Sequence, residues 1–282
     1  IDIILDSINN QIIYQTNTSI HRISLSNLKT TSSVKIKNSS LTPSKMILRK
    51  NKLLFLDQRG GDIFKINSND SLYKTDNSHI VNFFIGTNNF VKNDTIFKHG
   101  GYGYWTHSNF LIYYEELTKE WEIYPISDKT EIPPGINNQL SVVIDNAYYF
   151  FGGTSIFQKG IRVPTNLNND VWQFNFNTKK WKRLGTFLRE PIYPIYTSFK
   201  KDNNLFVVNM QRKLFKIDLL NNTLSEFKMS PILYQLVKNI KPIYFKDFLY
   251  YLNDSGKINK IAVKEITKNP IIISKFYDTQ NI

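Results

Sequence analysis

The chain has 282 residues and no cysteine, and its 36 Lys and Arg residues outnumber 23 Asp and Glu residues to give a formal net charge of +13. The absence of cysteine excludes disulfide bonds and thiolate metal sites. The apolar runs are only a handful of residues long, which excludes a membrane-spanning helix. We expect one domain over residues 1–282, because this length suits a single continuous core. The start at Ile1 indicates a processed or trimmed chain, and together with the lack of cysteine it favours an extracytoplasmic location, in the cell envelope or secreted.

Six units with the same order of parts follow one another along the chain. In each, a polar turn leads into a hydrophobic strand, a short loop and a second strand in which apolar and polar residues alternate. The units begin at residues 10, 51, 93, 146, 204 and 247. One further strand precedes each unit, at 1–5, 44–49, 80–91 (with a break at Gly86 as the alternative), 140–144, 195–199 and 240–245. A fourth strand ends the unit, as at 121–124, 181–184 and 271–274.

The third and fourth units share a closer pattern. The third contains Gly100-Gly101 and later Thr118-Lys-Glu-Trp121, and the fourth contains Gly152-Gly153 and later Thr178-Lys-Lys-Trp181. The first glycine lets the chain leave its strand with unusual dihedrals, and the second allows close backbone approach. Each Trp offers a large apolar plate for packing against the next sheet, so we interpret these residues as structural. This order of glycine doublet, aromatic strand and Trp resembles a kelch repeat.

The kelch resemblance implies a β-propeller, in which four-stranded blades surround a channel. The units recur at intervals of 41 to 58 residues, whereas propeller blades recur at roughly 40 to 50. The loop between Gly153 and Trp172 explains part of the excess in the fourth unit. We therefore predict an all-β fold: a single β-propeller with six four-stranded blades, or seven if the chain is incomplete.

The positive charge suggests attraction to anionic surfaces, polyanions or acidic proteins. Basic runs do not exceed a dipeptide or two and the sequence contains no known nucleic-acid motif, so nucleic acid is not an expected partner. A simpler interpretation is that scattered lysines solvate the outer strands and deter edge-to-edge pairing. The partner that we expect is an acidic protein or an acidic glycan, and the sequence leaves the oligomeric state open.

Loops between second and third strands, and loops leading to the next blade, share one face of a propeller because successive strands alternate in direction. The resemblance implies that this is the ligand-binding face. Arginines in several of these loops could bind carboxylates through bidentate donors, and aromatic residues could stack against a sugar or peptide. The alternative is that these are ordinary loop residues scattered over the face. The predicted binding residues are Arg59, Tyr104, Trp105, His107, Arg162, Arg189 and Arg212.

Catalytic signatures are sparse. His99 and His107 flank one loop without the spacing of a metal-binding motif, and we interpret them as plain surface residues. The glycine-rich stretch Gly100-Gly-Tyr-Gly103 precedes no helix that could bind a phosphate. We predict no catalytic residue, no cofactor and no metal. The lack of cysteine also argues against the copper-oxidase type of kelch protein.

Two functions remain. We favour a non-catalytic binding propeller that recognises an acidic protein or glycan through loops on one face, as part of a larger cell-envelope assembly or sensor. The alternative is a kelch-type sugar-isomerising enzyme, similar to sialic-acid mutarotases and epimerases. Arginines around a buried Glu at the channel mouth would favour the enzyme, and an open mouth with arginines and aromatics would favour the binding protein.

Overall fold

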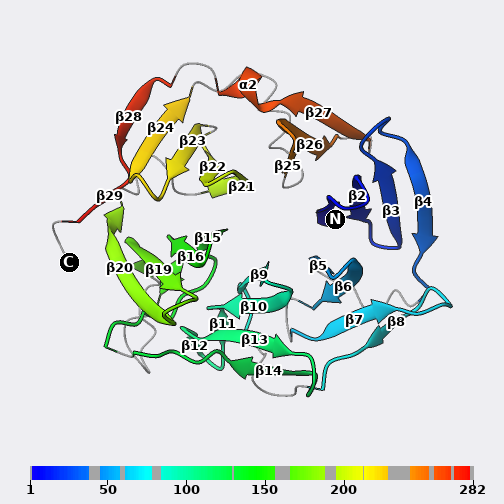
Figure 1. Cartoon of the computed structure of the whole chain (residues 1–282), viewed down its shortest axis with the longest axis horizontal. Helices are drawn as coiled ribbons and strands as arrows, with labels where there is room; N and C mark the ends of the chain where they lie inside the picture. The colour runs from blue at the N-terminus through cyan, green and yellow to red at the C-terminus, as the bar shows by residue number, and fades with distance from the viewer. Residues whose placement is uncertain are drawn as a thin grey trace. The chain divides into compact units, whose positions relative to one another are not determined.

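The computed structural model describes residues 2–37, 45–57, 61–77, 84–128, 130–155, 166–187, 195–211, 213–227, 242–253, 257–267 and 270–279. The chain divides into two compact units, each built of antiparallel sheets (Figure 1). Unit 1 comprises Ile1–Ser39 and Leu188–Asp278, and unit 2 comprises Ser40–Phe187 and Thr279–Ile282. The six main sheets of the described residues correspond to the six predicted units, and we number them blades one to six in chain order.

Unit 2 contains blades two, three and four. Their strands pair with their neighbours in the order in which the chain makes them, because short polar turns return each strand beside the one before it. The strands are β5 (Lys45–Arg49), β6 (Lys52–Leu56), β7 (Ile63–Ile66), β8 (Leu72–Lys74), β9 (Asn88–Lys92), β10 (Thr95–His99), β13 (Leu111–Glu115), β14 (Glu120–Ile123), β15 (Leu140–Ile144), β16 (Ala147–Phe151), β19 (Asp170–Asn175) and β20 (Lys180–Phe187). Two small hairpins interrupt blades three and four, formed by β11 (Tyr102–Gly103) with β12 (Thr106–His107) and by β17 (Thr154–Ser155) with β18 (Asn166–Leu167).

Unit 1 contains blades one, five and six. Blade one has the four predicted strands, and blade six has three strands in the described residues. The strands are β1 (Asp2–Asp6), β2 (Gln11–Gln15), β3 (Ser19–Ser24), β4 (Thr30–Lys35), β21 (Ile195–Lys201), β22 (Asn204–Asn209), β23 (Leu214–Asp218), β24 (Thr223–Phe227), β25 (Ile243–Phe245), β26 (Phe248–Leu252) and β27 (Ile258–Ala262). After β27 come α2 (Val263–Ile266), β28 (Ile272–Lys275) and β29 (Tyr277–Asp278).

The prediction that 271–274 forms the fourth strand of the last blade is wrong. β28 pairs antiparallel with β24 and becomes the fifth strand of blade five. The chain leaves β27 through the single helical turn α2, whose apolar side chains are buried in the core of blades five and six. The side-chain Oδ1 of Asn222, just before β24, then accepts hydrogen bonds from the backbone N–H groups of Phe276 and Tyr277 at 3.1 and 2.8 Å. These contacts hold the backbone that directly follows β28 beside the start of β24.

Trp121 and Trp181 lie between neighbouring blades, which confirms the predicted structural role. Trp121 on β14 is 3% exposed, packs with apolar residues of β5, β6 and β7, and donates a hydrogen bond from Nε1 to the Gly61 carbonyl at 3.0 Å. Trp181 on β20 is 4% exposed and packs in one cluster with Phe97 of blade three. Its ring centroid lies 4.9 Å from that of Phe174.

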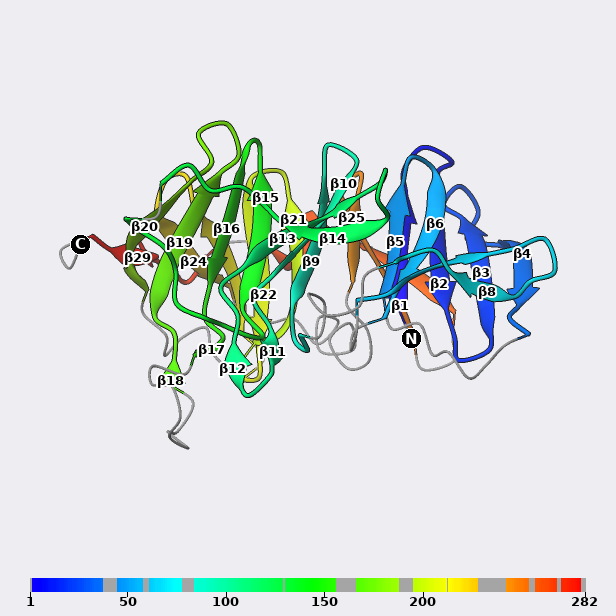
Figure 2. The same ribbon diagram turned by 90° about the horizontal axis from the view of Figure 1, so that it is seen from below.

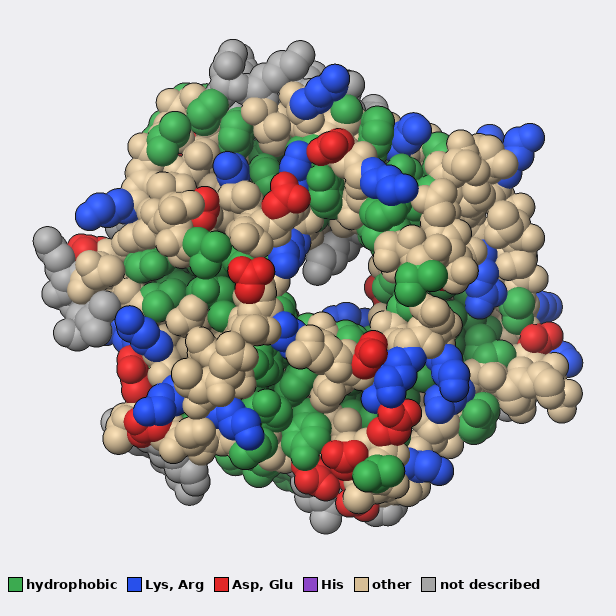
Figure 3. Space-filling view, viewed as in Figure 1, with side chains coloured by type: hydrophobic (Ala, Val, Ile, Leu, Met, Phe, Trp, Pro, Cys, Tyr) green, Lys and Arg blue, Asp and Glu red, His purple; other side chains and the backbone are tan. Residues whose placement is uncertain are grey.

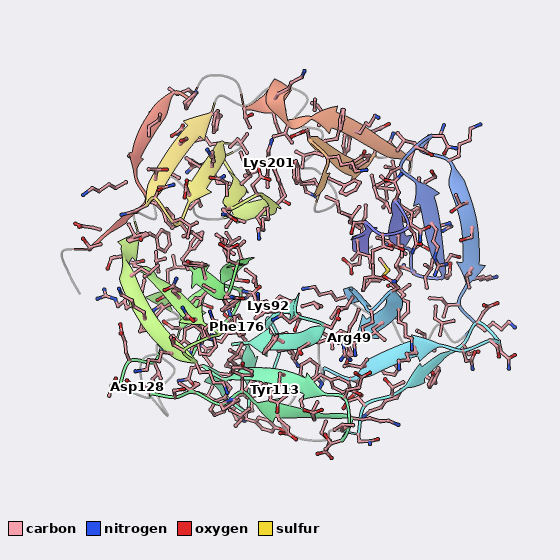
Figure 4. All side chains as sticks on the ribbon, in the orientation of Figure 1. Arg49, Lys92, Tyr113, Asp128, Phe176 and Lys201 are labelled. Atoms are coloured by element: carbon pink, nitrogen blue, oxygen red, sulfur yellow. The ribbon has the colours of Figure 1, made fainter. Side chains whose placement is uncertain are left out.

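Basic residues at the ends of the innermost strands tie neighbouring blades of the same unit together (Figure 4). In unit 2, Arg49 donates to the backbone oxygen of Asp94, and Lys92 donates to the backbone oxygen of Asp145 at 2.6 Å. In unit 1, Lys201 pairs with the Asp247 carboxylate at 2.9 Å. Each acceptor lies in the first turn of the following blade. Contacts between exposed groups contribute little to stability, so their main effect is to fix the alignment of adjacent blades.

The basic charge is dispersed on the face seen in Figure 3. Lys and Arg side chains there are interleaved with Asp and Glu and do not gather into one patch. The ion pairs of unit 2 include Arg49–Glu116 at 2.9 Å and Lys74–Asp62 at 3.0 Å. No helix in the described ranges is long and apolar enough to cross a membrane.

Candidate functional site

The glycine doublets bring separate loops of unit 2 into contact. Gly100 and Gly101 directly follow β10, and their φ angles are +74° and +100°. A Cβ atom on Gly100 would lie 2.4 Å from the backbone oxygen of Ile136, and the N–H of Gly101 donates to that same oxygen at 2.7 Å. Gly152 and Gly153 after β16 also have positive φ angles, of +68° and +79°. Both predicted reasons for the doublets, the left-handed backbone and the close approach, are therefore confirmed.

The β11–β12 and β17–β18 hairpins extend from the same side of unit 2, below its blades in Figure 2. Each hairpin is bridged to the segment that enters its own blade. Ile85 forms an antiparallel bridge with Tyr102, and Asn137 forms one with Thr154. The entry segments and the hairpins therefore lie on one face of unit 2, as the sequence predicts for loops of these two kinds.

A polar cavity of about 290 Å³ opens on this face. Three stretches that are far apart in the sequence form its lining, and each belongs to the entry into the innermost strand of a blade. Four of the lining side chains are carboxamides, and Lys45 is the only titratable residue of the lining. The lining residues are Lys45, Gly86, Thr87, Asn88, Asn89, Asn138 and Gln139.

Hydrogen bonds among these residues fix the shape of the cavity. Lys45 Nζ donates to the backbone oxygen of Asn89 at 3.0 Å, and Thr87 Oγ1 donates to Asn89 Oδ1 at 3.2 Å. Asn88 Nδ2 donates to the backbone oxygen of Gln139. Gln139 Oε1 is buried and has no hydrogen-bond partner among the described residues. A buried acceptor without a partner costs free energy, so the surrounding contacts must hold the Gln139 side chain in this position.

His99 supports the cavity from behind through Gln139. Gln139 Nε2 lies 3.1 Å from His99 Nδ1 and donates to the His99 backbone oxygen at 3.0 Å, while Tyr148 Oη lies 3.2 Å from the same Nδ1. His99 is fully buried, and burial lowers its pKa to about 3. Burial likewise raises the pKa of Tyr148. A neutral imidazole and a neutral phenol therefore hold Gln139 in place at physiological pH.

The structure describes three of the seven predicted binding residues. Tyr104 and Trp105 form the turn of the β11–β12 hairpin and are 57% and 91% exposed. His107, on β12, is only 8% exposed, with its ring 5.2 Å from that of Tyr102. The interpretation of His99 and His107 as surface residues is wrong, because both imidazoles fill the interior beneath the loops that they flank. The four predicted arginines, Arg59, Arg162, Arg189 and Arg212, lie outside the described residues.

The sequence reasoning missed every residue that lines the cavity. A signal was present in the entry segments: Gly86 follows the bridged Ile85, Asn138 follows the bridged Asn137, and both have left-handed φ angles of +75° and +53°. Aligning the segments before the first strands, rather than the strands themselves, would have placed amide-rich stretches in equivalent positions. In an Asn-rich chain this signal is weak.

Another perturbed group lies away from the cavity. Lys98 is 2% exposed, and its Nζ lies 5.0 Å from the centroid of the Trp121 ring. Burial lowers its pKa to about 8, against the opposing effect of Asp76, Asp57 and Asp62. It is enclosed too fully to meet a substrate. Within the described ranges, no group of three or more His, Asp or Glu side chains is placed to hold a metal ion.

Comparison with known proteins establishes the fold. The chain is similar to a solved structure described as "Structure of YjhT", with a TM-score of 0.60 over 97% of this chain and 96% of that one, at 12% sequence identity. No protein-family model matches the chain, and neither does a curated protein sequence. At so low an identity the likeness concerns architecture alone. Together with the six antiparallel sheets, it shows that the chain is an all-β protein with the fold of a six-bladed β-propeller.

Proposed function

We propose that the chain is a kelch-like binding propeller, acting as one domain, that recognises an acidic glycan through the cavity face of unit 2. The observation that carries this proposal is the cavity itself. Carboxamides both donate and accept hydrogen bonds, which suits the hydroxyl groups of a sugar. The lining thus offers a hydroxylated ligand several directional contacts in a space close to the lower end of the range for small-ligand pockets.

Lys45 supplies the preference for an acidic sugar. Its ammonium group is fixed at the rim by the hydrogen bond to the Asn89 backbone, so it can meet a carboxylate without losing much side-chain freedom. The formal net charge of +13 would further speed the approach of an anionic ligand. The four predicted arginines stay part of this proposal as further carboxylate-binding groups of the same face.

Replacing Lys45 tests this function. We expect wild-type protein to bind a hyaluronan hexasaccharide or an oligosialic-acid hexamer, measured by isothermal titration calorimetry, and to bind neutral maltohexaose more weakly. Lys45→Gln should weaken binding of the acidic hexamer about tenfold, because a hydrogen bond to a charged group contributes about 1.5–3 kcal/mol. Raising the salt concentration from about 0.1 to about 1 M should have a smaller effect on the variant, since screening acts on the charge that it lacks.

Lys52→Gln is the matched control, because Lys52 is an exposed lysine at the start of the neighbouring strand β6. It removes the same charge from the chain and should leave the affinity unchanged. Failure of both acidic hexamers to bind, or equal affinity of wild type and Lys45→Gln, would contradict the proposal. If the protein instead speeds anomer exchange of the bound sugar in proton NMR, the sugar-isomerising alternative replaces the non-catalytic one.

A further inference from the structure

The turn of the β11–β12 hairpin has an unusual composition for its backbone conformation. Tyr104 and Trp105 are its two central residues, and their φ angles are +50° and +63°. A two-residue hairpin turn of this kind needs positive φ at both positions and is normally made by Asn-Gly or Asp-Gly. Bulky aromatic residues in this region are genuine outliers, because their Cβ atoms crowd the backbone.

Three other two-residue turns of the chain follow the usual chemistry. Asn93 and Asp94 connect β9 to β10, Lys50 and Asn51 connect β5 to β6, and Lys246 and Asp247 connect β25 to β26, all with positive φ. Each of these pairs contains Asn or Asp, whose short polar side chains tolerate the left-handed region. Tyr104-Trp105 contains neither Asn nor Asp, so it differs from these three two-residue turns in having a bulky aromatic at both left-handed positions.

Backbone hydrogen bonds fix the base of the hairpin, and these contacts hold the turn in its strained left-handed conformation. Tyr102 exchanges two backbone hydrogen bonds with Ile85, of 2.9 and 2.7 Å, and Ser108 N–H donates to the Gly101 oxygen at 2.8 Å. The Tyr104 ring meets Phe84 edge-on at 6.2 Å. Trp105 is 91% exposed, whereas the other three tryptophans of the chain, Trp121, Trp172 and Trp181, are each 5% exposed or less. Backbone strain that presents an indole to solvent points to a function.

The base of the hairpin adjoins the cavity. The hairpin is bridged to Ile85, and the next residues of that segment, Gly86 to Asn89, line the cavity. The methyl carbon of Thr87 lies so near Gly101 that a Cβ atom there would be 2.6 Å from it. A ligand chain that leaves the cavity along this segment would therefore meet the aromatic turn.

We propose that Tyr104-Trp105 is a second subsite, which stacks against a sugar ring of an extended acidic glycan whose other end occupies the cavity. The inference rests on the proposed function and adds that the ligand is an oligosaccharide. A pyranose ring has an apolar face of C–H groups that covers an indole, and a rim of hydroxyls for amides. A nucleic-acid strand would also stack on an exposed indole, but it binds along a basic groove, and the lining of this cavity contains a single basic residue.

Iodide quenching of tryptophan fluorescence tests the subsite directly, because iodide can reach Trp105 but not the three buried indoles. We expect a quenchable fraction in the free protein that Trp105→Ala abolishes. Saturation with the hyaluronan hexasaccharide or the oligosialic-acid hexamer should remove that fraction, while saturation with glucuronic acid or sialic acid monosaccharide should leave it. A thymidine dodecamer is the competing ligand. If it removes the quenchable fraction and neither acidic hexamer does, the proposal is overturned in favour of single-stranded nucleic acid.

The double variant Tyr104→Asn, Trp105→Gly separates strain from function. Replacing the aromatics by the normal turn residues should raise the thermal midpoint, by about 2–4 °C for relief of strain in a chain of this size. It should weaken binding of the acidic hexamers at least tenfold and leave binding of the monosaccharides unchanged. A midpoint that does not rise, or an unchanged affinity for the hexamers, would overturn the inference and leave the proposed function standing. If wild-type protein binds neither hexamer, the proposed function falls as well.

Discussion

Trp181→Ala should lower the free energy of unfolding by about 3–5 kcal/mol, the usual cost of truncating a large buried aromatic. Trp181 is 4% exposed, and its ring contacts those of His99, Phe150 and Phe174 at centroid distances of 5.1, 5.7 and 4.9 Å. The deletion would leave a cavity between blades three and four that rigid sheets cannot close. Equilibrium denaturation with urea measures the change.

Trp105→Ala is the matched control for this prediction. It removes the same side chain from a position that is 91% exposed, and surface changes of this kind usually stay within about 0.5 kcal/mol. Equal stabilities of the Trp181→Ala variant and the wild type would show that the cluster between the blades is not packed as described.

Acidification should destabilise the protein between pH 6.5 and pH 4 through His99. The unfolded chain binds a proton at this residue near its ordinary pKa of 6.5, whereas the folded protein does so only near a pKa of about 3. The unfolded state therefore holds more protons throughout this window. The stabilisation is fully present above pH 6.5 and is lost as the pH falls towards 3. At about 1.4 kcal/mol per pH unit, the loss by pH 4 is roughly 3 kcal/mol.

The measurement for this prediction is the free energy of unfolding as a function of pH for wild type and His99→Gln. The variant should show a flatter dependence between pH 6.5 and 4, even though it is less stable at pH 7. His21→Gln is the control, since it removes a half-buried histidine of unit 1 that stacks on Tyr14 at 4.6 Å. Parallel pH curves for wild type and His99→Gln would refute the role assigned to His99.

The sequence predicted the strands well because their signal is local. Alternating apolar residues, polar turns and the glycine doublets are each contained within a few residues, and the repeated Thr118-to-Trp121 and Thr178-to-Trp181 phrases aligned two units directly. The exposed aromatic turn was also within reach, since Tyr104 and Trp105 follow a glycine doublet in a loop between strands. Their left-handed backbone was not predictable, because no residue type in the turn requires it.

What the sequence could not reveal depends on contacts between distant segments. The apolar run at 271–274 can pair with any open sheet edge, and its place on blade five is decided by the α2 turn and by the hydrogen bonds of Asn222. His99 and His107 resemble loop residues until the packing of neighbouring loops buries them. The cavity joins the entries to three blades, and none of its amide side chains is distinctive in its own segment.

Hydrogen exchange in the presence of an acidic hexasaccharide tests most directly whether the glycan binds at the cavity face of unit 2. With the hyaluronan hexasaccharide or the oligosialic-acid hexamer bound, we expect slower exchange of backbone amides in residues 84–89, 102–107 and 136–139. The turns at Asn93-Asp94 and Lys119, at the opposite ends of the strands of blade three, should exchange at the same rate as in the free protein. Slower exchange confined to those turns would contradict binding at the cavity face. So would saturation with the hexamer that leaves exchange in the cavity segments unchanged.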